Sequence, residues 1–216
     1  MSKRENILVI AAHSDDHIIG AGGTIAKYAA EGKKVRVVVL SYGEKTHPWL
    51  KARYSKEMRA QEAKSADKLV GCKSTFFDLK EGKFEEGYPK IKQKIVSILK
   101  KQKPVKIFTH SNEDIHPDHR AAYAITEDAL KELKETGIKP EMYLFSIWNP
   151  ISPRRNNTPK MYVDISKTHI KKMAALSHFR SQWAALALLI GSIIAKEVKN
   201  GLHIGSLCAE RFYKHK

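Results

Sequence analysis

Residues 7–32 decide the fold, and they read ILVIAAHSDDHIIGAGGTIAKYAAEG. The run at 7–12 is continuously apolar and begins with a β-branched residue, which is typical of a strand buried on both faces. The glycines at 20–23 lead into a helical stretch at 24–31, which Gly32 closes as a C-cap. A buried strand that runs into a helix predicts the start of a βαβ unit.

The same alternation of strand and helix continues along the chain. More strands are expected at 35–40, 74–79, 105–109, 142–148 and 161–165, and more helices at 54–70, 88–101, 117–135, 167–177 and 182–199. This order predicts a Rossmann-like, doubly wound α/β fold with a mostly parallel sheet and helices on both faces. Residues 149–160 are rich in proline and asparagine and are expected to form a loop, so one domain is expected over residues 1–216.

Composition narrows the class of protein. The 216 residues carry 39 Lys and Arg against 23 Asp and Glu, and the formal charge of +16 suggests a nucleic acid, an anionic membrane surface or an anionic substrate. The apolar fraction of 42% excludes a disordered chain. Cys72 and Cys208 cannot form a disulfide framework or a Cys-x-x-Cys zinc cluster, so a reducing, cytoplasmic location is expected. No secretory signal is expected either.

One stretch is apolar enough to raise the question of a membrane. It begins at Trp183 and ends at Ala195, and only Gly191 and Ser192 interrupt it. Its length falls short of the roughly 20 residues that span a bilayer, so no transmembrane segment is expected. We expect a helix there that is buried or that forms the interface of a homo-oligomer, and a peripheral membrane helix is the alternative.

Two loops at the carboxyl ends of expected strands concentrate polar side chains. The sequence HSDDH at 13–17 follows the first strand, and HSNEDIHPDH at 110–119 follows the fourth. In a doubly wound sheet the ligand crevice lies at the carboxyl ends of the strands, where the strand order reverses. Ordinary loops of this kind favour Gly, Ser or Asn, so the imidazoles and carboxylates gathered here indicate a functional site.

These side chains have the types and the spacing of a zinc site. His13 and Asp16, and likewise His116 and His119, are three residues apart and converge on one side of a helical turn. Pro117 suits the first position of a helix, so the second pair is expected at a helix N-terminus. A His, Asp, His set drawn from both loops leaves one position for water, which is the open geometry of a catalytic zinc. The alternative is a pair of solvated polar loops.

The glycines at 20, 22 and 23 form part of a dinucleotide-binding fingerprint. That fingerprint needs a third glycine where Ile25 stands, and an acidic residue where Ser41 stands after the second strand. Asp15 and Asp16 lie nearby and would repel a pyrophosphate. A nucleotide-binding Rossmann-like protein is therefore a weak alternative, and the glycines are expected to serve tight turning and close packing of helix and strand.

At this point the two polar loops resemble the motifs of a known family. The stretch AAHSDDHIIGAGGTIAKY at 11–28, followed by THSNEDIHPDHRAA at 109–122, is similar to the PIG-L/LmbE-type zinc-dependent N-deacetylases, which typically remove acetyl groups from N-acetylglucosamine units. Weaker similarity continues in RAQEAKSADKLVG at 59–71, YVDIS at 162–166 and SHFRSQ at 177–182. The resemblance covers nearly the whole chain, from His13 to about Glu210.

The resemblance implies an activity and roles for particular residues. It implies that His13, Asp16 and His119 bind zinc, and that an N-acetylated amino sugar is the substrate. It also implies that Asp15 is the general base, and that His116 assists at the oxyanion or at the leaving group.

Two positions depart from the family motif, and the role of Asp118 is inferred from its chemistry and not from the resemblance. Ser14 replaces the usual proline, which removes a rigid ring. His17 replaces the usual glutamate beside the metal, and a fourth zinc ligand from His17 is an alternative that would close the catalytic position. Asp118 is a third catalytic candidate, expected to orient His116 and raise its pKa, or else to interact with the helix dipole.

The positive charge gives one competing function, a nucleic-acid-binding protein. Such a protein needs a basic stripe that is interleaved with aromatic or arginine contacts. Here 30 of the 39 basic residues are Lys, and they are spread along the chain without a long basic run. This pattern is more typical of a solvated surface, so we expect no nucleic-acid partner.

Four more side chains receive simple interpretations. Arg59 and Glu62 share one helix face and are expected to form a salt bridge. Asp114 is interpreted as a turn residue rather than a ligand, and His110 as a structural residue.

The remaining candidates lie in loops that are expected to border the crevice. His47, Trp49 and Tyr54 either stack on a sugar ring or belong to ordinary surface. Arg154 and Arg155 are candidates for contact with a phosphate or carboxylate of the substrate.

Overall fold

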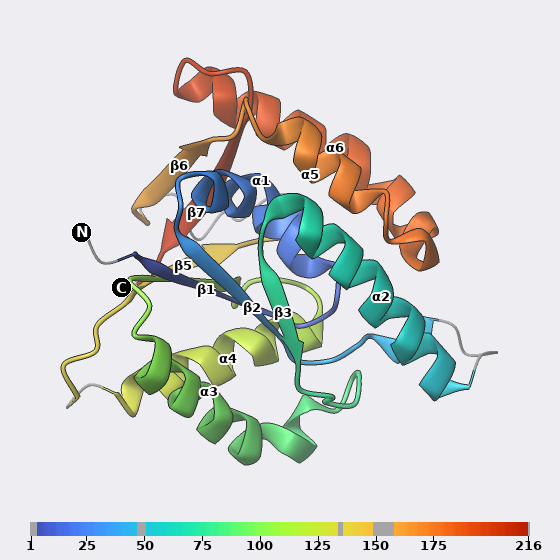
Figure 1. Ribbon diagram of the computed structural model, residues 1–216, viewed down its shortest axis with the longest axis vertical. Helices are drawn as coiled ribbons and strands as arrows, with labels where there is room; N and C mark the ends of the chain where they lie inside the picture. Colours follow the sequence, from blue (N-terminus) through green and yellow to red (C-terminus); the bar gives the residue numbers. More distant parts are fainter. Residues whose placement is uncertain (1–3, 47–50, 134–135, 149–157, 216) are drawn as a thin grey trace.

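Figure 1 shows the computed structural model of the chain, which describes residues 4–46, 51–133, 136–148 and 158–215. Within these residues seven strands form one sheet in the order β3-β2-β1-β4-β5-β7-β6. Neighbours from β3 to β5 pair in parallel, while β7 runs antiparallel to β5 and to β6. The expected doubly wound, mostly parallel α/β fold is confirmed. The strands are β1 (Asn6–Ala11), β2 (Lys34–Val39), β3 (Lys73–Phe76), β4 (Lys106–His110), β5 (Glu141–Phe145), β6 (Lys160–Asp164) and β7 (Ala209–Lys214).

Helices cover both faces of this sheet, with α1, α2, α5 and α6 on one face and α3 and α4 on the other (Figure 1). Ile7 and Val9 of β1 pack against the first group, and Leu8 and Ile10 pack against the second, because side chains alternate along a strand. Burial on both faces explains the unbroken apolar run of β1. The helices are α1 (Asp16–Ala30), α2 (Ala52–Val70), α3 (Tyr88–Gln102), α4 (Pro117–Lys131), α5 (His169–Leu176) and α6 (Trp183–His203), with short 3₁₀ turns η1 (Glu44–Thr46), η2 (Phe84–Gly87) and η5 (Arg180–Gln182).

The observed elements differ from the expected ones in two ways. β7 is missing from the expected strands, because its sequence AERFYK is half charged and its partners β5 and β6 are distant in sequence. α1 begins at Asp16, before the expected start at residue 24, so the glycines lie inside the helix rather than in a turn. Their expected role in close packing is correct, since a Cβ added at Gly23 would lie 2.7 Å from Ile165.

A carboxylate of this chain caps α1 where the glycines interrupt it. Ala21 has non-helical torsion angles (φ −148°, ψ 15°). Glu210 of β7 then accepts hydrogen bonds from the backbone N–H groups of Gly23 at 3.0 Å and Thr24 at 2.8 Å. Glu210 therefore fills the position in which a helix N-terminus would bind a nucleotide phosphate, which argues against the nucleotide-binding alternative.

A buried lysine balances the charge of this carboxylate. Lys172 of α5 is 1% exposed, and its Nζ donates hydrogen bonds to Glu210 at 2.7 Å, to Glu197 of α6 at 2.5 Å and to the carbonyl of Ile19 at 2.8 Å. Burial lowers the pKa of Lys172, but the two carboxylates outweigh burial and raise it, which keeps the lysine charged. This ion cluster ties α1, α5, α6 and β7 together.

One helical segment in the described part of the chain, Arg180–His203, is long and apolar enough to cross a membrane. The segment is longer than the apolar run at 183–195 because it includes residues on both sides of that run. Only 22% of the segment's apolar window is buried, although Leu186, Leu189 and Ile193 pack into the core. By length and composition alone, a helix of a protein core passes the same test.

Candidate active site and metal centre

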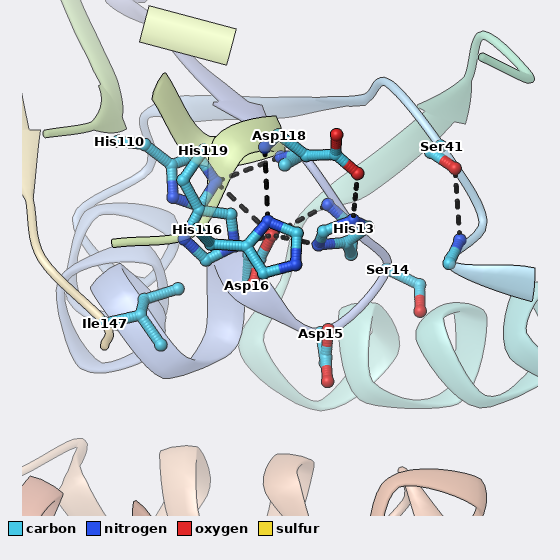
Figure 2. A network of polar contacts seen from close by, with 12 residues as sticks. His13, Ser14, Asp15, Asp16, Ser41, His110, His116, Asp118, His119 and Ile147 are labelled. Carbon is cyan, nitrogen blue, oxygen red and sulfur yellow. Dashed lines mark hydrogen bonds and ion pairs between the residues drawn. The ribbon is translucent and has the colours of Figure 1, made fainter. Parts of the chain in front are cut away.

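Both polar loops meet at one edge of the sheet. β1 lies between β2 and β4, so the chain winds one way from β1 and the other way from β4. The loops that follow these two strands therefore face each other where the strand order reverses, as predicted. Figure 2 shows the side chains of His13, Asp16, His116 and His119 gathered at this point.

Asp16 lies at the centre of the cluster. Its Oδ2 atom accepts a hydrogen bond from the backbone N–H of His13 at 2.7 Å. The same oxygen lies 3.4 Å from Nδ1 of His13 and 3.4 Å from Nε2 of His119. All three side chains are buried, and one possible ligand atom from each lies within 4.8 Å of the others. These separations are suited to one metal ion held between the three residues.

Two further carboxylates fix the orientation of the histidines. Nε2 of His13 lies 3.2 Å from Oδ2 of Asp118, and Nδ1 of His119 lies 3.1 Å from Oδ1 of Asp114. Each imidazole thus presents its other nitrogen to Asp16, as metal-ligating histidines do. Both ring nitrogens of His119 are buried without a well-formed hydrogen bond, and Nε2, which faces Asp16, is the one that a metal ion would supply with a bond. Two imidazoles and one carboxylate are a donor set that fits zinc.

The role expected for Asp118 needs correction, because its carboxylate does not orient His116. It contacts His13 and also accepts a hydrogen bond from the backbone N–H of Gly82 at 2.9 Å. His116 is the N-cap of α4, and its Nδ1 accepts the backbone N–H of Asp118 at 3.2 Å. Burial and the nearby His13 and His119 lower the pKa of His116, opposite to the expected direction.

Asp114 does more than the turn residue that the sequence indicates. It is 1% exposed, and its carboxylate accepts the backbone N–H groups of His116 at 3.0 Å, Ile147 at 3.1 Å and Trp148 at 3.3 Å. Burial alone would raise the pKa of Asp114, but the contact with His119 and the bond from His116 lower it to about 2. The bond within the β4–α4 loop follows from Asx-turn chemistry. The bonds from Ile147 and Trp148, which follow β5, join residues 33 and 34 positions apart, so no local sequence pattern predicts them.

His110 supports the site from behind. Its Nε2 accepts the backbone N–H of Ala12 at 3.0 Å, and its ring stacks on His119 at a centroid distance of 4.0 Å. Burial and the neighbouring His119 lower the pKa of His110 to about 4, so this imidazole is neutral. These contacts agree with the structural role that the sequence analysis gives it.

Protons compete with a cation for two of the histidines. Burial lowers the pKa of His13 and of His119, but their carboxylate partners outweigh burial and raise the pKa values to about 10 and about 9. Burial also opposes the charge of Asp16, yet the adjacent His119 and His110 hold its pKa well below the usual value. Near neutral pH, a metal ion must displace a proton from each of these two imidazoles.

Zinc binding is therefore expected to release about two protons per ion at pH 7. The affinity for zinc should then rise by up to about a hundredfold per pH unit, and level off as the pH approaches the raised pKa values. Calorimetric titration of the metal-free protein, in buffers of different ionisation enthalpy, counts the protons released. Asp118→Asn removes a partner of His13 and should lower the count. Zinc binding without proton release would contradict the prediction.

Asp15 lies apart from the histidine cluster (Figure 2) and is held from the other side. Arg59 of α2 is 2% exposed, lies 3.3 Å from Oδ1 of Asp15 through Nη2, and donates from Nε to the Ser14 hydroxyl at 2.9 Å. These contacts have no local signal in the sequence because they join residues 44 and 45 positions apart. The expected partner Glu62 accepts hydrogen bonds from Ser181, from its N–H at 2.8 Å and its hydroxyl at 2.6 Å. Ser14, which stands in place of proline, thus gives the arginine an anchor.

His17 turns away from the cluster, so the structure gives no support to a fourth ligand at this position. Its side chain is fully buried, and Nε2 lies 2.8 Å from Oδ1 of Asp67 on α2. The bond from His17 helps to lower the pKa of Asp67, against the effect of burial. Asp67 also accepts the backbone N–H of Ser74 at 2.7 Å, so this pair joins the start of α1 to β3.

A pocket of about 190 Å³ opens beside the cluster. One side of it is polar and the other is formed largely by α6. The residues that line it include His13, Asp15, Asp16, Arg59, Glu81, His116, Trp148, Gln182, Ala185, Leu186 and Leu189. Glu81, Trp148 and Gln182 have no assigned role in the sequence analysis, because only the folded chain brings their three segments together.

Several expected loop residues cannot be assigned to this pocket. Tyr54 is 61% exposed and is not one of the lining residues. His47, Trp49, Arg154 and Arg155 lie outside the described residues.

Comparison with known proteins identifies a matching family and relatives of this chain. Residues 8–130 match the PIG-L family, described as GlcNAc-PI de-N-acetylase. A 4-oxalmesaconate hydratase from Pseudomonas putida is 28% identical over 201 residues, which cover 83% of this chain and 74% of the relative. A 1D-myo-inositol 2-acetamido-2-deoxy-alpha-D-glucopyranoside deacetylase from Rhodococcus erythropolis is 27% identical over 210 residues, covering 83% and 68%.

A solved structure shares the fold over almost the entire chain. It is the N,N'-diacetylchitobiose deacetylase from Pyrococcus horikoshii, with a TM-score of 0.82 and 22% identity. The match covers 98% of this chain and 84% of that chain. Both polar loops fall inside the residues matched by the family, and the relatives include deacetylases and a hydratase.

Proposed function

The chain belongs to the PIG-L family of GlcNAc-PI de-N-acetylases, and from this premise we propose that it is a zinc-dependent N-deacetylase of an N-acetylglucosamine-type sugar. One observation carries the proposal. His13, Asp16 and His119 converge on one point beside a pocket, while the carboxylate of Asp15 lines that pocket from a separate position. The reaction consumes water and the acetamide, and yields acetate and the free amine.

The metal and the base have separate roles in this proposal. Zinc held by the three residues would supply Lewis acidity, which would lower the pKa of a nearby water molecule to about 7. Asp15 accepts the proton of the attacking water. Because Arg59 contacts Oδ1 of Asp15, we assign Oδ2 as the oxygen that takes this proton. Asp15 then returns the proton to the leaving nitrogen.

His116 is placed to stabilise the developing oxyanion. Its ring lines the pocket, and its Nδ1 already accepts the backbone N–H of Asp118. A neutral His116 therefore carries its hydrogen on Nε2, where it can donate to the amide oxygen. A donor that is fixed in advance costs no reorganisation during the reaction.

The Pseudomonas relative gives a second candidate, the addition of water to a carbon–carbon double bond, since its name is that of a hydratase. Both reactions need an activated water and a base. Only hydrolysis of the amide also needs a proton delivered to a leaving nitrogen. The products, acetate or a hydrated acid, separate the two candidates directly.

Acetate release across a panel of substrates tests the proposal. The panel holds N-acetylglucosamine, diacetylchitobiose, an inositol glycoside of N-acetylglucosamine, and 4-oxalmesaconate. We expect acetate from at least one sugar, loss of this activity after chelation, and recovery when zinc is added back. Hydration of 4-oxalmesaconate without acetate release would favour the second candidate, and inactivity on every sugar would defeat the sugar assignment.

We also propose that the protein works in the reducing cytoplasm. Cys72 and Cys208 are both free thiols, which supports the location that the composition predicts.

A further inference from the structure

A second group of metal-ligating side chains lies outside the candidate active site. His17 of α1, Asp67 of α2 and Cys72, which directly precedes β3, each offer one ligand atom, and these atoms lie within 4.8 Å of one another. His17 and Asp67 are buried, and Cys72 is partly buried. None of the three lines the pocket beside His13 and Asp16, so the proposed reaction gives them no role.

The three side chains already meet at one oxygen atom. Oδ1 of Asp67 lies 2.8 Å from Nε2 of His17 and accepts a hydrogen bond from Sγ of Cys72 at 3.2 Å. Its other carboxylate oxygen accepts the backbone N–H of Ser74 at 2.7 Å, which fixes the orientation of the carboxylate. Bonds of about 2.0–2.3 Å to a tetrahedral zinc ion place its ligand atoms roughly 3.3–3.6 Å apart. The two contacts of Asp67 therefore need to lengthen by only about half an ångström to admit such an ion.

Two buried polar atoms beside this group have no hydrogen-bond partner among the described residues. They are Nδ1 of His17 and the hydroxyl oxygen of Ser74. Buried polar atoms are normally bonded, so each exception calls for an explanation. When the neutral ring of His17 donates its hydrogen from Nε2 to Asp67, the lone pair on Nδ1 is unused. An imidazole lone pair and a hydroxyl without partners are groups that a bound cation and its water would satisfy.

The chemistry of the three ligands suits a divalent cation. Burial and the nearby Asp67 raise the pKa of the Cys72 thiol well above its usual value, so the thiol keeps its proton and is a poor nucleophile. A cation that binds there displaces this proton. One thiolate, one carboxylate and one neutral imidazole then balance the two charges of the ion. A neutral group of this kind is buried at a lower cost than an isolated charge.

A groove connects this group to the solvent. Its volume is about 550 Å³, and Asp67 and Cys72 are among the residues that line it. Three exposed lysines also line the groove, namely Lys64, Lys68 and Lys73. Their charges oppose the approach of a cation, but they also favour the thiolate form of a neighbouring cysteine. The groove supplies water for the fourth position that three protein ligands leave open.

We propose that His17, Asp67 and Cys72 form a second, exchangeable site for a zinc-like divalent cation, with a water molecule as the fourth ligand. A thiolate and an imidazole favour zinc over magnesium and calcium, which prefer oxygen ligands. The site gives a role to His17, whose ring turns away from the candidate metal centre.

An ion at this site would join three elements of the fold, α1, α2 and β3. His17 directly follows Asp16 in the first turn of α1, so an occupied site would hold in place the turn that carries Asp16. The proposal rests on residues outside the pocket and does not depend on which reaction the pocket performs.

Titration of the metal-free full chain with cobalt(II) alone, under reducing conditions, tests the proposal. Cobalt bound to a thiolate absorbs in the near ultraviolet through charge transfer from sulfur. The cluster of His13, Asp16 and His119 contains no sulfur, so this band reports the second site only. We expect the band in the wild type, with a single thiolate-bound cobalt ion per chain, and we expect zinc to abolish it by competition.

Substitutions assign the band to particular residues. Cys72→Ser should remove it, and Asp67→Asn should weaken cobalt binding at this site by at least about tenfold. Cys208→Ser is the matched control, because Cys208 is the other free, partly buried thiol and belongs to none of the metal-ligating groups in the described part of the chain. This variant should keep the full band. The circular dichroism spectrum and thermal midpoint of metal-free Cys72→Ser should match the wild type, since serine is close to cysteine in size.

His119→Ala separates this proposal from the proposed function. It removes a ligand of the candidate metal centre and should abolish acetate release, yet it should keep the thiolate band. A wild-type chain without the band at saturating cobalt overturns the proposal. A band that survives Cys72→Ser, that disappears in His119→Ala, or that zinc does not displace overturns it as well.

Discussion

Asp15→Asn is expected to lower the kcat for acetate release by about 10²–10⁴-fold, the contribution typical of a positioned general base. Asparagine keeps the shape of aspartate but cannot accept the proton of the attacking water. Zinc stoichiometry, measured by atomic absorption, should stay at the wild-type value, because Asp15 is separate from the cluster of His13, Asp16 and His119. Steady-state kinetics on the best sugar of the panel gives the change in kcat.

Glu113→Gln provides the control for this substitution. Glu113 belongs to the same pair of polar loops but is not among the residues that line the pocket, so its variant should keep the wild-type kcat. A wild-type rate in Asp15→Asn would place the base elsewhere. Loss of zinc from Asp15→Asn would instead make Asp15 part of the metal centre.

The second large effect is expected on stability, from Lys172→Met. The lysine is buried between Glu197 and Glu210, and its removal takes away the ammonium group that both buried carboxylates share, leaving Glu197 with His169 and Glu210 with two backbone N–H groups. Breaking a buried ion pair in this way typically costs about 3–5 kcal/mol of the free energy of unfolding. Denaturant titration followed by circular dichroism measures the loss.

Two further variants isolate the electrostatic cause. Lys171→Met changes the exposed neighbour on the same helix and should alter the free energy of unfolding by less than about 0.5 kcal/mol. Adding Glu197→Gln to Lys172→Met should recover part of the loss, because it removes one of the two stranded charges. If Lys172→Met is as stable as the wild type, the ion cluster does not hold these elements together.

The sequence predicts most of the fold because the decisive signals are local. The apolar run of β1 and the position of each polar loop after its strand follow from neighbouring residues, and the topology then brings His13 to Asp16 and His119. The start of α1 is lost because glycine normally ends a helix. Here the helix starts at Asp16, bends at Ala21, and starts again with a cap from Glu210, far along the chain.

The supporting contacts of the site are the part that sequence reasoning does not reach. Asp118 lies in the first turn of α4, two residues after His116, and this spacing suggests His116 as its partner, yet its carboxylate contacts His13, 105 positions away. Arg59 likewise contacts Asp15, while Glu62, with which a salt bridge was expected, accepts a hydrogen bond from Ser181. Side-chain partners of this kind depend on how helices and loops pack, which a periodic pattern does not encode.

The bonds from Gly23 and Thr24 to Glu210 also set an order of events during synthesis. They span 187 and 186 residues, so α1 leaves the ribosome long before the carboxylate that completes it. Until β7 emerges, Lys172 lacks one of its two carboxylate partners and the sheet lacks the strand between β5 and β6. The helix that begins with Asp16 is therefore expected to reach its final structure late in folding. A nascent chain that ends before β7 is expected to be inactive and prone to aggregation.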